Sequence, residues 1–162
     1  TWIGSNVTIM EGARIGKNCK IFPGAVIAAT PQDLKYDGEY STVHIGDGTT
    51  IREFVTINRG TKDREKTVIG KNCLIAAQVG IAGATTLEDG VILWGQVGVS
   101  KTLTIGSNAV VFKNIKVFTS IFSCYIKNKS LMTLQIFRFL VTKTRYNLLT
   151  SIIYKIEVFD SS

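Results

Sequence analysis

Histidine, proline and cysteine are scarce in this sequence. Its 162 residues include one histidine, two prolines and three cysteines. No cysteine belongs to a CxxC motif, so the spacing favours neither a metal site nor a disulfide framework. We therefore expect no metal ion, and free thiols in a reducing, cytoplasmic compartment. No apolar run reaches about 18 residues, and the sequence predicts no membrane span.

Positive charge is concentrated near the end of the chain. The net charge is +7. Residues 1–113 hold 12 lysines and arginines against 10 acidic residues, and residues 114–162 hold 7 against 2. The longer segment therefore has little net charge, and it carries no motif for RNA or DNA binding. We expect no nucleic-acid partner.

What the sequence has in abundance is an aliphatic residue at every sixth position. Of the twenty positions in this series from Ile3 to Val117, seventeen hold Ile, Leu or Val. The exceptions are Asp33, Glu39 and Asp63. A helix repeats at about 3.6 residues and a strand at about 2, so a period of six fits neither an amphipathic helix nor a plain sheet. It is the hexapeptide period of a parallel β-helix.

The neighbours of the aliphatic residue follow the same period. The residue two positions before it is small or β-branched, as Ala25, Val55 and Thr85 show. Glycine or an Asn-containing pair such as Lys71-Asn72 often comes after it. We predict an all-β solenoid shaped as a three-sided prism, with three units to a coil of about 18 residues. The aliphatic and small residues would point inward, and Gly and Asn would turn the corners.

Two segments interrupt the period. The first, residues 28–42, would place Asp33 and Glu39 in a dry axis, where an unpaired charge is very costly. We expect this segment to leave the prism as a loop, and such insertions often build the binding site of a solenoid. The second, residues 62–66, is a short charged bulge that fits a solvated corner. The β-helix is thus predicted over residues 1–117, with a loop excursion over 28–42.

Two strings in this region resemble a known family. One is Gln32-Asp-Leu-Lys-Tyr36, followed by Gly38-Glu39, and the other is Ile51-Arg-Glu53, followed by Arg59-Gly-Thr61. Both are similar to segments of the acyl-carrier-protein-dependent UDP-N-acetylglucosamine O-acyltransferases of lipid A biosynthesis. The resemblance covers roughly residues 1–112, and its strings are more specific than the hexapeptide period alone.

The resemblance implies a left-handed β-helix that forms a homotrimer, with active sites between neighbouring subunits. The implied reaction transfers a 3-hydroxyacyl group from acyl carrier protein to the 3-hydroxyl of UDP-N-acetylglucosamine, and it needs no cofactor. Gln32, Asp33 and Lys35 match the substrate-binding loop: Asp33 would accept a hydrogen bond from a sugar hydroxyl, and Lys35 would lie near acyl or phosphate groups. Arg52 and Arg59, expected on exposed faces of adjacent units, would attract the acidic carrier protein or form ordinary surface ion pairs.

One catalytic element of that family has no counterpart here. The reaction uses a histidine as general base, because the pKa of histidine lies near neutrality. The one histidine, His44, falls where the motif implies no catalytic role, and we interpret it as a surface residue. The coil that bears the family histidine is missing after Cys73, and further histidine positions hold Ala84 and Ser100. No catalytic residue is therefore assigned.

Two other functions stay open. The stretch from Leu74 to Gly83 and the string from Trp94 to Gly98 resemble the UDP-3-O-acylglucosamine N-acyltransferases, which would acylate a 2-amine. The third hypothesis is a catalytically silent hexapeptide scaffold that binds ligand without turnover.

The composition changes abruptly after Lys113. Residues 114–162 contain no glycine and no proline. The tail over 118–162 fits either a native segment or an extension that is not native to the protein. Apolar residues keep helical spacing there, which predicts one amphipathic helix over about 130–157. Its apolar face would cap the open end of the solenoid or lie on a membrane surface.

Overall fold

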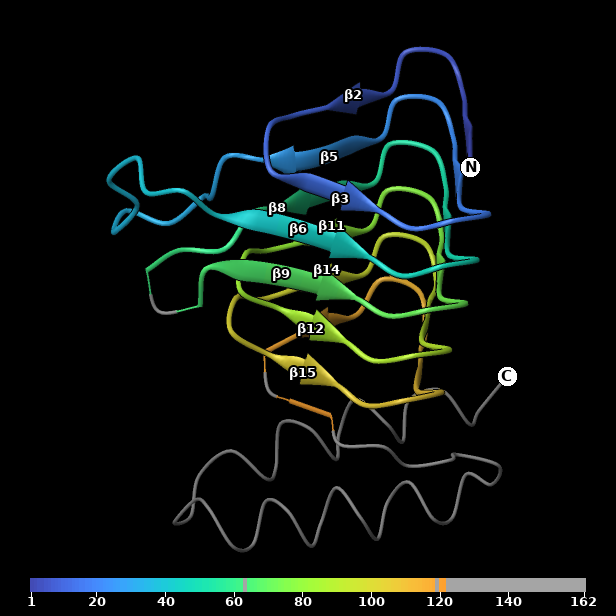
Figure 1. Ribbon diagram of the computed structural model, residues 1–162. Coiled ribbons are helices and arrows are strands. Elements are labelled where there is room, and N and C mark those ends of the chain that lie inside the picture. Colours follow the sequence, from blue (N-terminus) through green and yellow to red (C-terminus); the bar gives the residue numbers. More distant parts are fainter. Residues whose placement is uncertain (63, 119, 122–162) are drawn as a thin grey trace, which may run out of the picture. The chain divides into compact units, whose positions relative to one another are not determined.

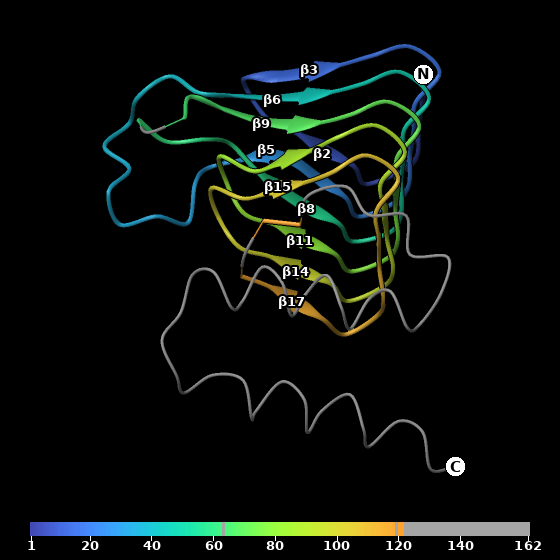
Figure 2. The same cartoon turned by 90° about the horizontal axis from the view of Figure 1, so that it is seen from below.

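A computed structural model describes residues 1–62, 64–118 and 120–121 of the chain. These residues form seventeen short strands, all in parallel pairs, and they contain no helix. The strands stack into three sheets, one on each side of a prism (Figures 1 and 2).

Each coil contributes one strand to each sheet, except that the last described coil contributes to sheets A and B alone. Sheet A contains β1 (Trp2–Ile3), β4 (Lys20–Ile21), β7 (Thr50–Ile51), β10 (Leu74–Ile75), β13 (Ile92–Leu93) and β16 (Val110–Val111). Sheet B contains β2 (Thr8–Ile9), β5 (Val26–Ala29), β8 (Thr56–Asn58), β11 (Gly80–Ile81), β14 (Gly98–Val99) and β17 (Lys116–Val117). Sheet C contains β3 (Ala13–Ile15), β6 (Thr42–Ile45), β9 (Lys66–Ile69), β12 (Thr86–Leu87) and β15 (Thr104–Ile105).

The chain passes through sheets A, B and C in turn and then returns to sheet A one coil further on. As it descends from the N-terminal end in Figure 1, it runs to the right across the front in sheet C and to the left across the back in sheet B. The helix is therefore left-handed. Equivalent residues pair in register, and Ile51 of β7 lies between Ile21 and Ile75. The predicted all-β, left-handed parallel β-helix is confirmed.

The two predicted inward positions fill the axis. Ile21, Ile51 and Ile75 have no exposed surface, and burial of such a side chain contributes about 1.5–3 kcal/mol. The small position is buried as well, even where it is polar. Thr49 is fully buried, and its hydroxyl donates a hydrogen bond of 2.7 Å to the carbonyl oxygen of Gly70. A buried hydroxyl is tolerated when it is satisfied in this way.

The corners are turned by the third residue after the aliphatic one, which adopts a left-handed conformation. Asn72 has a φ of 52° and Asn108 a φ of 58°, in agreement with the asparagines expected at corners. The glycine directly after the aliphatic residue was expected to turn the corner, but the structure gives it a different role. A Cβ at Gly46 would lie 2.6 Å from the carbonyl carbon of Gly70, so adjacent coils approach too closely there for any side chain.

Both interruptions leave the prism at the same corner, between sheets B and C. We call residues 30–41, between β5 and β6, the long loop, and residues 59–65, between β8 and β9, the short loop. Consecutive aliphatic positions of the repeat are 6 residues apart, whereas Ile27 and Ile45 are 18 apart and Ile57 and Ile69 are 12 apart. Each insertion therefore adds a whole number of repeats. The register resumes after both. Figures 1 and 2 show the two loops side by side, projecting from one edge of the prism.

The seventeen strands belong to one compact unit. The predicted helix over about 130–157 and Cys124 lie outside the described residues. In the part of the chain that the structure describes, no helix is long and apolar enough to cross a membrane.

Candidate functional site

The outer face of sheet B forms a groove of about 280 Å³ whose floor is partly bare backbone. Gly80 of β11 and Gly98 of β14 are directly paired there, and neither has a left-handed φ. A Cβ at either position would meet no atom nearer than 3.7 Å, so neither conformation nor crowding requires glycine. Glycine weakens a strand and often marks the close approach of a ligand or of another backbone.

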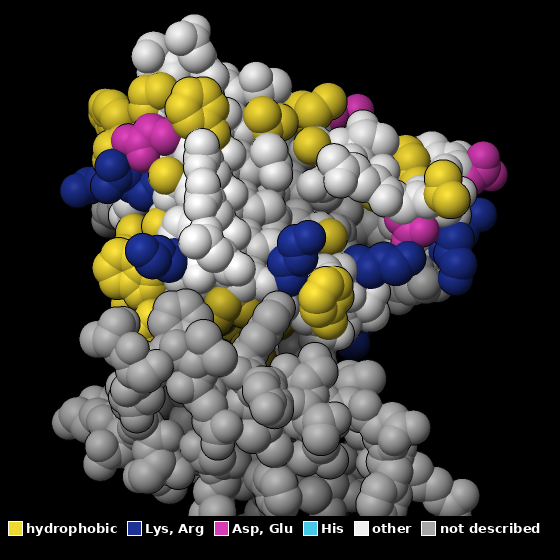
Figure 3. Space-filling view, turned by 180° about the vertical axis from the view of Figure 1, so that it is seen from behind, with side chains coloured by type: hydrophobic (Ala, Val, Ile, Leu, Met, Phe, Trp, Pro, Cys, Tyr) yellow, Lys and Arg dark blue, Asp and Glu magenta, His cyan; other side chains and the backbone are white. Residues whose placement is uncertain are grey.

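The side chains around this sheet-B groove are mostly small or uncharged. Thr56 of β8 lies toward one end of the groove. Lys116 of β17, the last described strand, and Phe118, just after that strand, line the other end. Gln32 reaches it from the long loop. Figure 3 shows this face as a largely uncoloured strip, with apolar side chains interspersed with charged ones on one side and the charged loop region on the other.

A second hollow, of about 360 Å³, lies at the corner beside the long loop. It shares Gln32, Ala82 and Ser100 with the sheet-B groove, so the two are continuous. We call it the corner hollow. Its other lining residues are Pro31, Asp33, Thr61, Gly83 and Lys101.

Hydrogen bonds fix the long loop to the next coil. Asn58, at the end of β8, is 6% exposed and donates its amide to the carbonyl oxygen of Thr30 over 2.7 Å. Arg59 donates an Nη2–H hydrogen bond of 3.3 Å to the hydroxyl of Tyr36. The loop is thus held both where it begins and in its middle.

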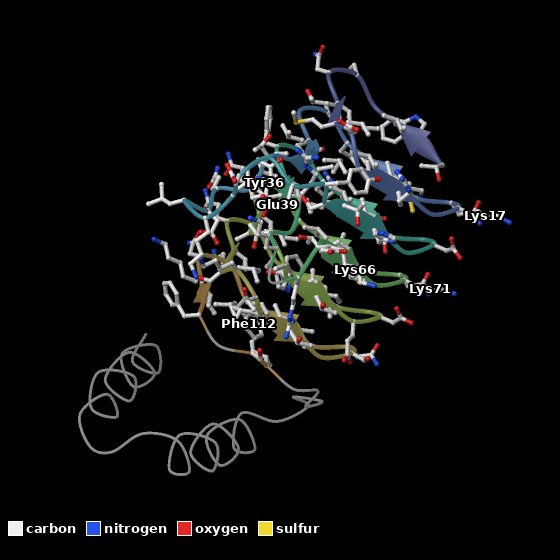
Figure 4. All side chains as sticks on the ribbon, turned by 60° about the vertical axis from the view of Figure 1, so that its left-hand side comes forward. Lys17, Tyr36, Glu39, Lys66, Lys71 and Phe112 are labelled. Atoms are coloured by element: carbon white, nitrogen blue, oxygen red, sulfur yellow. The ribbon has the colours of Figure 1, made fainter. Side chains whose placement is uncertain are left out.

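Glu39 joins the long loop to the short loop. Its Oε2 accepts a hydrogen bond of 2.8 Å from the N–H of Asp37, and its Oε1 accepts one of 2.9 Å from the N–H of Lys62. These donors, the N–H of Asp37 above all, lower the pKa of the Glu39 carboxyl. Figure 4 shows Glu39 next to Tyr36 in the long loop. The acidic residue that the axis could not hold is therefore a structural link outside it, as expected of a loop residue.

Asp33 is paired with a lysine from three coils further along. Lys101 Nζ lies 2.6 Å from Asp33 Oδ2, and the N–H of Lys35 donates a hydrogen bond of 3.2 Å to Oδ1. The Asp33 side chain is 12% exposed, whereas that of Lys101 is 56% exposed. The ammonium of Lys101, and then the N–H of Lys35, lower the pKa of Asp33. Asp33 is consequently an ionised acceptor and a weak base.

The structure brings together two of the three predicted substrate-binding residues. Gln32 and Asp33 both line the corner hollow. Lys35 is exposed, and it lines neither the corner hollow nor the sheet-B groove. What these residues bind stays a prediction.

The two arginines proposed for carrier-protein contact lie apart. Arg52 follows β7 of sheet A, makes two hydrogen bonds of 2.9 and 3.0 Å to Glu53, and covers the ring of Phe22 at 4.6 Å. Arg59 is only partly exposed at the corner between sheets B and C, and its Nε is buried. The expectation that Arg59 lies on an exposed face is wrong, because the long loop places Tyr36 against its guanidinium.

Sequence reasoning missed Lys101 and Lys116. The period contains part of the signal: Arg59, Gly83 and Lys101 each come two positions after an aliphatic residue, which places them in one column at the corner between sheets B and C. The contact between Lys101 and Asp33 has no such signal. It depends on the path of the long loop, which no repeat describes.

In the part of the chain that the structure describes, the ionisable side chains that line the two hollows are Asp33, Lys101 and Lys116. His44 lies on sheet C in β6, where its Nε2 is 3.1 Å from the hydroxyl of Thr42. It is exposed, as interpreted from the sequence. Among the described residues, no three His, Cys, Asp or Glu side chains gather to hold a metal ion. The described residues of the site can therefore bind a polar or anionic ligand, and no histidine lines either hollow.

Comparison with known proteins finds similarity to hexapeptide transferases. A family model for bacterial transferase hexapeptides (six repeats) matches residues 1–29, and one for the hexapeptide repeat of succinyl-transferase matches residues 66–94. The chain is 47% identical over 102 residues to the acyl-[acyl-carrier-protein]–UDP-N-acetylglucosamine O-acyltransferase of Gloeothece citriformis, which covers 62% of this chain and 37% of that protein. The enzyme of the same name from Helicobacter pylori is 37% identical over 123 residues, covering 72% and 44%.

Solved structures of such enzymes are similar to this chain. The UDP-N-acetylglucosamine O-acyltransferase of Moraxella catarrhalis matches with a TM-score of 0.57 and 33% identity over 71% of this chain and 50% of that one. The UDP-N-acetylglucosamine acyltransferase of Bacteroides fragilis matches with a TM-score of 0.62 and 26% identity, covering 99% and 72%. The resemblance inferred from the two strings is confirmed. The chain spans less than half the length of either curated relative.

Proposed function

We propose that this chain, a hexapeptide-repeat β-helix similar to the UDP-N-acetylglucosamine O-acyltransferases of lipid A biosynthesis, binds UDP-N-acetylglucosamine and takes part in acylating its 3-hydroxyl. The acyl donor is a 3-hydroxyacyl group on acyl carrier protein. One observation carries the proposal: Gln32 and Asp33 of the family-like string line a hollow that continues into a groove with a glycine floor. The loop motif and the concave surface coincide, although the sequence alone does not place them together.

The reaction requires no cofactor, because the thioester of the donor is already activated. The 3-hydroxyl oxygen attacks the thioester carbonyl, its proton passes to a base, and the carrier thiol leaves after taking up a proton. Asp33 suits the binding part of this scheme. Its ionised carboxylate accepts a hydrogen bond from a sugar hydroxyl, which positions the neighbouring hydroxyl for attack.

The proposed assembly is a homotrimer in which a neighbouring subunit closes the sheet-B groove. The floor of Gly80 and Gly98 lets a flat surface approach closely, whether that surface is a ligand or another subunit. Arg52, 45% exposed beside Phe22, is the proposed contact for the acidic carrier protein.

A turnover assay tests the proposal. The full chain is incubated with UDP-N-acetylglucosamine and 3-hydroxyacyl carrier protein, and O-acylated sugar nucleotide is measured by mass spectrometry. Product above the no-enzyme background supports the transferase. Acylation only of a 2-amine acceptor would instead favour the N-acyltransferase alternative.

A second candidate function is ligand binding without turnover. It is favoured by the pairing of Asp33 with Lys101, which holds the carboxylate in an ion pair, and by the position of the one histidine on sheet C. Calorimetry with UDP-N-acetylglucosamine separates the two functions. Binding without product supports the scaffold, and product formed after insertion of a histidine-bearing coil behind Cys73 would strengthen it. If neither binding nor product is found, both proposals fail.

A further inference from the structure

The ion pair at the corner hollow joins a side chain that can move to one that cannot. The Lys101 side chain is 56% exposed and has a flexible four-carbon stem, whereas the Asp33 side chain is 12% exposed. Asp33 also accepts the N–H of Lys35 over 3.2 Å, within a loop whose start is held by Asn58. When the pair separates, Lys101 is the partner that moves.

Space for a ligand lies beside that ammonium. Lys101 lines the corner hollow of about 360 Å³ together with Gln32, Ser100 and Thr61. Gly83, one coil earlier in the same column, has no side chain, and its backbone packs against the carbonyl oxygen of Arg59. The position between Arg59 and Lys101 in this column therefore carries no side chain.

The charges that line the two hollows favour an anion once Lys101 is released. Asp33 and Lys101 neutralise each other, and Lys116 in the continuous sheet-B groove adds one positive charge. An ammonium group binds phosphate readily as a point charge. The carboxylate of Asp33 would repel a phosphate unless the ammonium of Lys101 lies between the two.

We propose that Lys101 is a phosphate-binding residue whose ammonium rests on Asp33 while the corner hollow is empty and moves to the phosphate of an incoming ligand. The inference rests on the proposed function and extends it. The phosphate belongs to the diphosphate of the sugar nucleotide or to the phosphodiester of the phosphopantetheine arm of the carrier protein. Release of Lys101 frees an oxygen of Asp33 for the sugar hydroxyl, so phosphate binding prepares the sugar site.

Calorimetry on the full chain with UDP and, separately, with 4′-phosphopantetheine tests this proposal and distinguishes the two sources. Lys101→Met is expected to lower the affinity for the phosphate ligand about tenfold or more, because a charge-assisted hydrogen bond is lost. Lys101→Arg restores most of the affinity. Uridine and pantetheine, which carry no phosphate, are expected to bind Lys101→Met and the unmutated chain alike.

Lys71→Met is the matched control. Lys71 is also an exposed lysine beside an aspartate, with its Nζ 3.9 Å from Asp47, but it lies at the corner between sheets C and A. Figure 4 shows Lys17 and Lys71 pointing outward from that corner, away from the long loop. This variant removes the same charge and is expected to keep the affinity for both phosphate ligands.

Asp33→Asn separates phosphate binding from a purely structural role. It frees Lys101, so UDP is expected to bind several-fold more tightly, and the gain is expected to vanish in the double variant Asp33→Asn with Lys101→Met. If Lys101 only ties down the long loop, both single variants break the same tie and weaken binding alike. That result, or unchanged affinity in Lys101→Met, overturns the proposal.

The outcome is independent of catalysis. A chain that binds UDP with the expected variant pattern but makes no product supports Lys101 and leaves only the transferase in doubt. A chain that makes product with the same KM in Lys101→Met as without the substitution keeps the transferase and overturns the role of Lys101. Circular dichroism melts of each variant show whether it is folded before its affinity is interpreted.

Discussion

The amide of Asn58 donates a hydrogen bond to the carbonyl oxygen of Thr30 and so ties the first residue of the long loop to the end of β8. The two residues are 28 positions apart in the chain. Pro31, Gln32 and Asp33 follow Thr30, and all three line the corner hollow. The position of the candidate site therefore depends on a buried side chain of the next coil.

Replacing Asn58 with alanine is expected to loosen the long loop. The carbonyl oxygen of Thr30 loses its donor, and the free energy of unfolding falls by about 1–2 kcal/mol. Hydrogen exchange of peptides covering residues 30–41 is expected to speed up. Thr56→Ala, on the exposed side of the same strand, serves as the control, and equal exchange in both variants would show that Asn58 does not hold the loop.

Two glycine substitutions are expected to have opposite effects on stability. A methyl group at Gly83 would overlap the carbonyl oxygen of Arg59, so Gly83→Ala lowers the free energy of unfolding by roughly 3 kcal/mol. A methyl group at Gly80 meets nothing nearer than 3.7 Å, so Gly80→Ala raises it by about 0.5 kcal/mol. Urea unfolding measures both. A Gly83→Ala variant as stable as Gly80→Ala would contradict the close coil contact.

Acid is expected to loosen the long loop before the β-helix unfolds. The pKa values of Asp33 and Glu39 lie below their ordinary values of 3.8 and 4.5. The folded state therefore holds these protons less readily than the unfolded chain, and the stabilisation is complete above about pH 5. It is lost as the pH falls through 4.5 and 3.8 toward the folded-state values.

Limited proteolysis between pH 7 and pH 3 measures this loss, with an acid-stable protease and cleavage mapped to residues 30–41. Glu39→Gln removes one of the two titrating carboxyl groups, so the difference in loop cleavage between pH 7 and pH 3 is expected to be smaller in this variant. Cleavage that begins in the coils rather than in the loop would contradict the prediction.

Cys73 is expected to react slowly with thiol reagents in the folded chain. It is 2% exposed, and burial raises the pKa of its thiol, which leaves little thiolate at neutral pH. Iodoacetamide labelling followed by mass spectrometry is expected to modify Cys73 in guanidinium chloride but not in buffer. Rapid labelling in buffer would indicate that the coil around Cys73 opens.

The period of six was sufficient to predict the β-helix and most of its core. Residues such as Ile51, Ile75 and Thr49 lie inward because each coil repeats the environment of the one before it. The loop segments were recognisable as well, since Asp33 and Glu39 could not enter a dry axis. The role of Gly46 was misread, because the distance between coils does not appear in any single repeat.

The candidate site was predictable only in part. Gln32 and Asp33 carry a recognisable string, and both line the corner hollow. Arg59 was misplaced, because its exposure depends on how the long loop folds over it. Lys101 was not identified, although the period puts it in the same column as Arg59.

The sequence by itself determined the prism, because a local period of six dictates which side chains face the axis whatever lies elsewhere in the chain. Only the tertiary structure decided the chemistry at the corner between sheets B and C. There the partners are 68 residues apart in the case of Asp33 and Lys101, and 23 apart in the case of Tyr36 and Arg59. Such contacts depend on the path of an irregular loop, and that path is set by hydrogen bonds to other coils rather than by the repeat.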